Sequence, residues 1–372
     1  MLLDPEPPDG TDHRSAAVWT HSFQETGRRN RQALVNLAVL TQAKPGLGED
    51  AEPTVLYCAP ENRGLIGVYD GLGGAGARPA GRTGDARVLS NAFVASRLAH
   101  LTVQEWFVEQ VRSEGGARDL HTRLAEVLGD ARRGRTKFGG TLSRDLPTTI
   151  ALIEHRRVGK RLRVTARWAG DSRCYVFDRH HGLQQLSRDD SDIDDVLQVL
   201  IADQPMTNVV SASGDFRIHE RSIEVEPPCV LLCATDGFFN YVGSPALFEY
   251  HLWDCLLPSA GRADPDGLRV WGQLLADRVR SYTADDASLA LTALGYKGLN
   301  PLRRDVQRRH DYLRSEHYAL LEGLDPDRDR ERFVQARQES WRRYRPGYTR
   351  YLTGCPDAAG SHPTATTMES AD

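Results

Sequence analysis

Hydrophobic and polar positions follow two different periods along this chain of 372 residues, and each period predicts its own kind of element. Short apolar runs between turn residues predict strands at 54–58 and 65–69, with another at or just before 32–40. From Asp85 to Val111 the apolar residues recur at helical spacing, and 120–128 continues the same pattern. The first part of the chain is therefore predicted to place strands before long helices.

After Pro147 the period changes to that of strands. Antiparallel strands are predicted at 148–154, 161–168 and 174–177, a polar strand-like segment at 209–226, and buried strands at 229–234 and 288–294. Helices are predicted at 245–257 and 268–281, and residues 189–202, apolar on one face, predict a helix or a mobile flap. Elements grouped in this order indicate an α+β fold with antiparallel sheets rather than an alternating parallel sheet.

The two ends of the chain differ from this central part. Residues 1–20 lack periodicity and 353–372 are rich in Ser, Thr, Ala and Pro, so both are predicted to be disordered. Residues 298–352 predict an appended pair of helices, broken at 324–326. Their apolar stripe and many arginines predict either packing on the main domain with a solvated Arg face, or a docking surface for an acidic or phosphorylated partner.

Composition narrows the class of protein. With 40% hydrophobic residues, 26% charged residues and a net charge of -4, the chain suits a globular protein that lacks general affinity for nucleic acid or membrane surfaces. No apolar run approaches the roughly 20 residues of a membrane span, and residues 1–15 lack the apolar core of a secretory signal. The six scattered cysteines suit reduced thiols, so a cytoplasmic location is expected.

One stretch stands out as a candidate for chemistry. A strand-like apolar run ends at Asp70, and a glycine-rich turn from Gly71 to Gly76 follows it directly. The plain alternative is a simple turn. The same letters match a dinucleotide-binding fingerprint, but that motif needs a second parallel strand soon after a short helix, whereas a long helical tract follows here.

Further aspartates share the setting of Asp70, at the end of an apolar strand or in the adjoining turn. They are Asp171, Asp236, Asp285 and Asp286. If their strands are neighbours, the carboxylates repel one another and raise each other's pKa unless a divalent cation neutralises them. Ligation by oxygen alone favours Mg²⁺ or Mn²⁺ over zinc. The sequence therefore predicts a shared cation site.

Taken together, these segments resemble the metal-dependent protein phosphatases, the type 2C serine/threonine phosphatases, in their bacterial form. The matching segments, in the family's order, are Val68–Gly74, Thr148–Thr149, Gly170–Arg173, Leu186–Ser191, Ala234–Gly237 and Asp285–Ser288. The resemblance implies a phosphatase-like domain over 21–297, built as two stacked antiparallel β-sheets flanked by α-helices. The helices of 298–352 lie beyond it as a C-terminal extension.

The resemblance also implies a site and an activity. Mg²⁺ or Mn²⁺ would lie between the sheets, as two ions with a third as an addition. The implied ligands are Asp70 bridging both ions, Gly71 through its carbonyl, Asp236 and Asp285, with Asp171 a candidate for the third ion. The implied reaction is hydrolysis of phosphoserine or phosphothreonine by attack of a metal-bound hydroxide. The implied partner in bacterial signalling is a phosphorylated protein, either a Ser/Thr kinase or its target.

The sequence departs from the family in its first motif, which carries Asn-Glu-Asp or Asn-Gln-Asp. The nearest match is Asn30-Arg31-Gln32, where both acids are absent. Just before it, Arg28 or Arg29 would supply the arginine that holds the substrate phosphate. Loss of the acids at Arg31 and Gln32 favours an alternative from another class, an inactive phosphatase fold that binds a phosphoprotein or a kinase.

Overall fold

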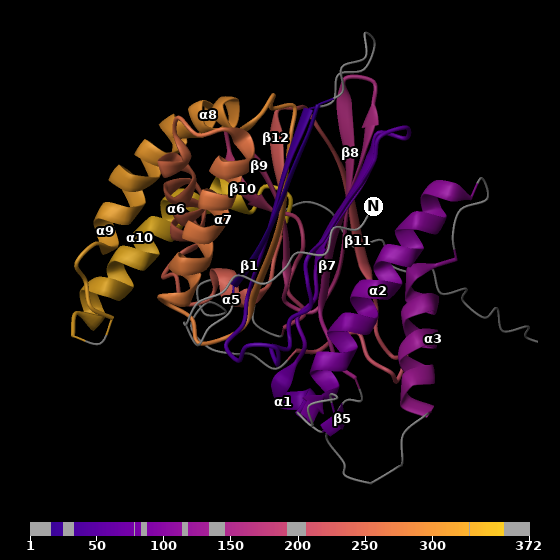
Figure 1. The fold of residues 1–372 in the computed structure, drawn as a ribbon. Coiled ribbons are helices and arrows are strands. Elements are labelled where there is room, and N and C mark those ends of the chain that lie inside the picture. The colour runs from indigo at the N-terminus through magenta and orange to yellow at the C-terminus, as the bar shows by residue number, and fades with distance from the viewer. Residues whose placement is uncertain are drawn as a thin grey trace, which may run out of the picture.

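Two antiparallel sheets stack face to face, and helices cover both outer faces (Figure 1). The structure is a computed structural model that describes residues 16–24, 33–77, 79–82, 88–113, 118–133, 146–191, 206–326 and 328–352. The predicted fold class, an α+β sandwich of antiparallel sheets between helical layers, is confirmed by this arrangement.

The two sheets draw their strands from distant parts of the chain. Sheet 1 has the order β1 (Ala16–Gln24), β2 (Ala33–Thr41), β13 (Ala287–Leu294), β12 (Cys229–Ala234), β9 (Arg173–Asp178) and β10 (Gly182–Gln185). Sheet 2 has the order β11 (His219–Val225), β8 (Arg161–Ala169), β7 (Ile150–Val158), β4 (Arg63–Val68) and β3 (Thr54–Cys58). All neighbouring strands are antiparallel.

A tightly packed apolar layer joins the sheets. Along β8 the inward positions Leu162, Val164 and Ala166 are buried, and they alternate with exposed or half-buried polar residues such as Arg161 and Arg163. This period of two is the pattern of a strand with one face on the core. On sheet 1, strands β2, β12 and β13 are buried along their whole length, because helices cover their outer face.

Each sheet carries its own helical layer. On sheet 2 lie α2 (Asn91–Arg112) and α3 (Leu120–Arg133), drawn in purple in Figure 1. On sheet 1 lie α6 (Pro245–Leu256), α7 (Asp264–Arg280), α8 (Leu299–Leu313) and α10 (Arg330–Tyr348). The short elements are α1 (Gly73–Gly76), the ribbon of β5 (Pro79–Arg82) and β6 (Val88–Ser90), α5 (Asp236–Phe239) and α9 (Ala319–Leu321). None of the helices within the described ranges is long and apolar enough to cross a membrane.

Three sequence predictions need correction. Residues 16–20, expected to be disordered, belong to β1, which pairs with β2 along its full length. The helix expected from Asp85 begins at Asn91, because 88–90 pair with β5 and the Ser90 hydroxyl caps the helix by accepting from Phe93 N. Of the strand-like segment 209–226, only 219–225 form a strand. The ends at 1–15 and 353–372, and most of the predicted flap, lie outside the described residues.

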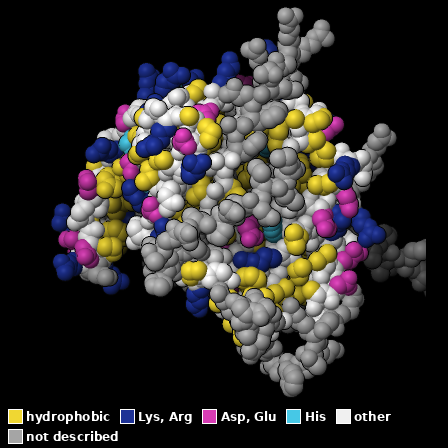
Figure 2. Space-filling model, viewed as in Figure 1, with side chains coloured by type: hydrophobic (Ala, Val, Ile, Leu, Met, Phe, Trp, Pro, Cys, Tyr) yellow, Lys and Arg dark blue, Asp and Glu magenta, His cyan; other side chains and the backbone are white. Residues whose placement is uncertain are grey.

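The C-terminal extension, residues 298–352, packs its apolar stripe against the helices on sheet 1, as one of the two predictions had it. Its buried residues include Leu302, Val306, Leu313, Tyr344 and Tyr348. A π-helical turn at Arg314–Tyr318 shifts the helical phase just before Leu321, which is buried. On the outer face basic and acidic side chains are interspersed (Figure 2), with ion pairs such as those of Arg342 and Arg343 to Glu339.

Candidate active site

The sandwich brings the predicted aspartates to one end, where α1 and α5 lie in Figure 1. Asp70 follows the last residues of β4 in sheet 2, and Asp236 follows β12 in sheet 1. Since β13 runs antiparallel to β12, its first residues, preceded by Asp285, lie at that same end. Asp171 occupies the tight turn between β8 and β9. Antiparallel pairing therefore collects side chains from both sheets.

The backbone around Asp70 is held by a pair of threonines. Thr149 N and Thr148 Oγ1 both donate to the Asp70 carbonyl, at 2.8 and 2.7 Å. The Thr149 hydroxyl lies 2.6 Å from that of Ser172, in the turn that carries Asp171. Gly71 pairs with Thr148, and a Cβ at Gly71 would lie only 2.6 Å from the Glu49 carbonyl oxygen. Only glycine allows this approach.

The structure adds an acidic pair that sequence reasoning missed. Glu49 and Asp50 lie in the loop before β3, at the same end of the sandwich. The Asp50 carboxylate is fully buried and accepts from Thr235 Oγ1 at 3.0 Å, beside Asp236. Asp286 fixes the loop by accepting from Glu49 N at 2.5 Å and from Ala43 N at 2.7 Å.

This pair adds acids near the predicted site that are separate from the first motif. The negative charge of Asp50 is close enough to raise the pKa of Asp70, and the Glu49 carbonyl oxygen lies against Gly71. The signal available in the sequence was Gly48-Glu49-Asp50, an acidic pair directly before an expected strand. The previously matched segment, with Arg28, Arg29, Arg31 and Gln32, lies outside the described residues.

Electrostatic repulsion dominates this cluster. Burial, followed by the negative charges of nearby aspartates, raises the pKa of Asp70 well above its usual range. The aspartates concerned are Asp50, Asp236, Asp171 and Asp285. Burial and the charges of Asp286 and Asp285 raise the pKa of Asp50 to about 8. Burial also raises the pKa of Glu49, with smaller contributions from the same pair.

The residues present fit a divalent cation by their chemistry. Carboxylate and carbonyl oxygens are the ligands of Mg²⁺ and Mn²⁺, and a cation would remove the repulsion that raises these pKa values. The fit is not preformed. Asp285 is exposed, Asn240 Nδ2 donates to Asp236 at 3.0 Å, and no three acidic, His or Cys side chains of the described residues converge as a ready ligand set. Cation binding would therefore draw the carboxylates together.

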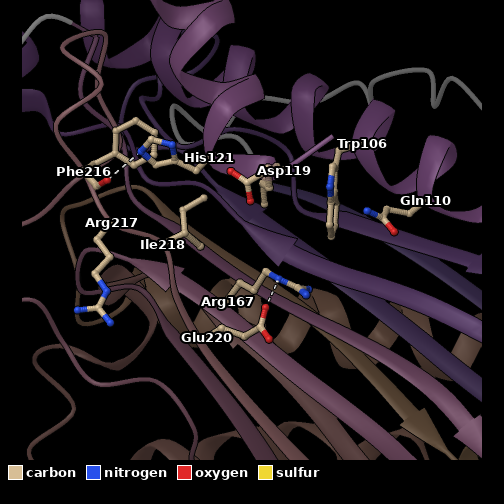
Figure 3. Close-up of a pocket in the computed structure, with 10 residues that line it drawn as sticks. Trp106, Gln110, Asp119, His121, Arg167, Phe216, Arg217, Ile218 and Glu220 are labelled. Atoms are coloured by element: carbon tan, nitrogen blue, oxygen red, sulfur yellow. Dashed lines mark hydrogen bonds and ion pairs between the residues drawn. The ribbon is translucent and has the colours of Figure 1, made fainter. Parts of the chain in front are cut away.

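A separate cavity of about 430 Å³ lies on the outer face of sheet 2, beside α2 and α3 (Figure 3). Its polar lining is largely engaged within the protein. Arg167 pairs with Glu220 at 2.9 Å, and the His121 ring lies 3.0 Å from the Phe216 carbonyl oxygen. None of the predicted site residues lines it. The cavity and the acidic cluster are thus distinct features.

Comparisons with known proteins find similarity in structure alone. No family model and no curated protein matches the chain. Similar solved structures include PppA, a regulatory component of T6SS in Pseudomonas aeruginosa (18% identity, 76% of this chain and 98% of that chain, TM-score 0.43). Others are Ser/Thr phosphatase Stp1 from Staphylococcus aureus (17%, 78% and 99%, 0.43) and serine/threonine phosphatase PstP/Ppp from Mycobacterium tuberculosis (15%, 76% and 99%, 0.40). Phosphatases of this kind are the proteins that the sequence motifs resemble.

Proposed function

We propose that this chain is a Mg²⁺- or Mn²⁺-dependent phosphatase that hydrolyses phosphoserine or phosphothreonine in a protein substrate. One observation supports this most: carboxylates from both sheets gather at one end of the sandwich, with pKa values raised by burial and mutual repulsion. Such a cluster stays ionised near neutral pH only beside cations. The proposed partner is a phosphorylated Ser/Thr kinase or its target in the cytoplasm of a bacterium.

The proposed ligands are those at the strand ends. Asp70, Asp236 and Asp285 would hold two cations together with the Gly71 carbonyl, and Asp171 is the candidate for a third. When bound, the cations lower the pKa of a water ligand and neutralise charge on the phosphoryl group. Arg28 or Arg29 would bind the substrate phosphate, since an arginine fork matches its oxygens.

The surrounding residues would orient these ligands before a cation arrives. Thr148 and Thr149 fix the Asp70 backbone through their two hydrogen bonds to its carbonyl, and the Thr235 hydroxyl donates to Asp50. Glu49 and Asp50 would act as anionic partners behind the ligands, the role that the resemblance assigns to the acids of the first motif. A phosphoester oxygen would then bind at a site where the cations supply the positive charge.

The alternative is an inactive phosphatase fold, argued from the absence of acids at Arg31 and Gln32. Against it, Asp50 supplies another acid close to Asp70. The exposed side chain of Asp285 remains in its favour, because an inactive protein has no need for a closed ligand set. Catalysis must therefore be measured directly.

The test is hydrolysis of an aryl phosphate and of phosphoserine, phosphothreonine and phosphotyrosine peptides, with and without Mn²⁺. We expect Mn²⁺-dependent turnover that chelation removes, with the first two peptides preferred. Asp70→Asn should abolish turnover, and Asp215→Asn, on the exposed loop before β11, is the matched control that should not. Binding of Mn²⁺ without turnover of any of these substrates would support the inactive alternative.

A further inference from the structure

Arg173 is the feature that connects the candidate site to the C-terminal extension. It is the first residue of β9, directly after Asp171 and Ser172, and its side chain is almost completely buried. Its Nε and Nη2 donate to the Asp189 carboxylate at 2.9 and 2.6 Å. Its guanidinium lies 4.1 Å from the centre of the Phe239 ring. The contact with Phe239 reaches α5, the short helix that Asp236 begins.

The extension supplies a further contact to this guanidinium. Tyr348, in the last turn of α10 and 1% exposed, accepts from Arg173 Nη1 at 3.5 Å and donates to the Tyr175 hydroxyl at 3.4 Å. The preceding residue, Gly347, fits so closely that a Cβ there would lie 2.7 Å from the His181 carbonyl oxygen. The end of α10 is therefore fixed against the β9–β10 hairpin that carries Arg173.

From Arg173 the contacts continue to the ligands of the candidate site. Ser172 bonds through its hydroxyl to Thr149, and Thr149 N donates to the Asp70 carbonyl. Arg173 thus adjoins the turn of Asp171, the helix of Asp236 and, through Ser172 and Thr149, the backbone of Asp70. A shift of the guanidinium would therefore displace the atoms of each of these elements.

We infer that Tyr348 is a positioning residue of the candidate active site, so that the extension completes the site as well as covering sheet 1. The inference rests on the proposed function for its catalytic part. A buried guanidinium that loses an acceptor moves toward the acceptors that remain, because leaving a buried donor unsatisfied is costly. Removing the Tyr348 hydroxyl should therefore displace Arg173 and loosen the turn of 170–172.

The chain offers a matched control one turn earlier on the same helix. Tyr344 is also buried, but its hydroxyl bonds at 2.5 Å to Glu249 of α6, within the helical layer. Tyr348→Phe and Tyr344→Phe each remove a single buried hydroxyl from α10. They differ in whether that hydroxyl contacts Arg173.

Both variants and the wild type would be compared in the full chain, well below their unfolding midpoints. Mn²⁺ binding by calorimetry, kcat and KM for an aryl phosphate, and thermal unfolding after chelation are the measurements. We expect Tyr348→Phe to weaken Mn²⁺ binding about tenfold and to lower kcat with KM unchanged, as outer-shell changes at metal sites do. Tyr344→Phe should lower the unfolding midpoint and leave Mn²⁺ binding unchanged.

The outcomes separate the inference from the proposed function. If the wild type hydrolyses the aryl phosphate and both variants bind Mn²⁺ like the wild type, the inference is overturned and the function stands. If the wild type binds Mn²⁺ without hydrolysis and Tyr348→Phe alone binds it more weakly, the positioning role is supported and the function fails. Equal weakening of Mn²⁺ binding by both variants would overturn the inference, since it would show a general effect of α10.

Discussion

Two regions of the molecule bury carboxylates, and their surroundings shift the carboxylate pKa values in opposite directions. In the helical layer on sheet 1, Glu249 is completely buried and bonded to Arg309 through both carboxylate oxygens at 2.9 Å. Leu183 N and Trp253 Nε1 donate to it as well. Burial alone would raise the pKa of Glu249, but Arg309 and these hydrogen bonds outweigh it, and the pKa is lowered.

At the strand ends the balance is reversed. Asp70 and Asp50 are surrounded by further carboxylates, and their pKa values are raised. The helical layer holds a charge whose partners are all part of the chain, whereas under the proposed function a bound cation would be the partner of the charges at the strand ends. This difference is what distinguishes a structural ion pair from a binding site, although both bury a carboxylate.

The largest expected effect comes from removing a charge at the strand ends. Asp236→Asn should lower turnover about 10³-fold or more, at least ~4 kcal/mol in transition-state free energy, because a charged ligand is lost. The chelated variant should unfold at a slightly higher temperature than wild type, since Asp236 repels Asp70. Steady-state kinetics at saturating Mn²⁺ and thermal unfolding check the two parts. Turnover like that of wild type would remove Asp236 from the ligand set.

In the helical layer the same kind of change should act on stability instead. Arg309→Met leaves Glu249 buried without its cation and should lower the free energy of unfolding by about 3–5 kcal/mol. Adding Glu249→Leu should restore much of that loss, because an apolar pair replaces the ion pair. Chemical denaturation measures both. If Arg309→Met alone were as stable as wild type, Glu249 would have to reach solvent or another cation.

A smaller effect is expected from Glu49, which lies at the strand ends but is not proposed as a direct ligand of the cations. Glu49→Gln should raise the Mn²⁺ concentration for half-maximal activity about 10–100-fold, equal to ~1.4–2.7 kcal/mol. The control is Glu52→Gln, three positions along the same loop and more exposed. Titration of activity against Mn²⁺ distinguishes them, and equal shifts would assign the effect to net charge alone.

The smallest effect concerns the pH dependence of the chelated protein. The folded pKa of Asp50, about 8, exceeds its unfolded value, about 4. Between these values the folded state holds the extra proton, so stability should fall as pH rises from about 4 to about 8. We expect a loss on the order of 1 kcal/mol, because water entry relaxes part of the repulsion. Asp50→Asn should flatten this slope, whereas Asp215→Asn should leave it as steep as in wild type.

The sequence predicted what depends on local pattern. Strand ends at Asp70 and Asp236 follow from apolar runs that stop at an acid, and β8 follows from its period of two. Strand β1 was missed because residues 16–20 form a strand only through pairing with β2. Glu49 and Asp50 were missed because they lie in a loop, where no period marks them. Their place beside Asp70 follows from Asp286, 237 residues away from Glu49.

The link between Tyr348 and Arg173 was beyond sequence reasoning for a similar reason. These residues are 175 positions apart, and helical spacing reports only which face of α10 is buried. The face was predicted; the strand that it meets was not. Contacts between distant segments depend on how whole layers dock, which a single sequence does not encode as a local pattern.

The ion pair of Glu249 cannot form in a newly made chain until residues much later in the sequence have been synthesised. Its partners Arg309 and Tyr344 follow it by 60 and 95 residues. At about 5–20 residues per second, roughly 3 to 20 s of synthesis separate the glutamate from those partners. During that interval α6 has a charge on the face that it must later bury, and the outer surface of sheet 1 stays incompletely covered. A growing chain of this protein is thus exposed to chaperones and proteases until its last helices leave the ribosome.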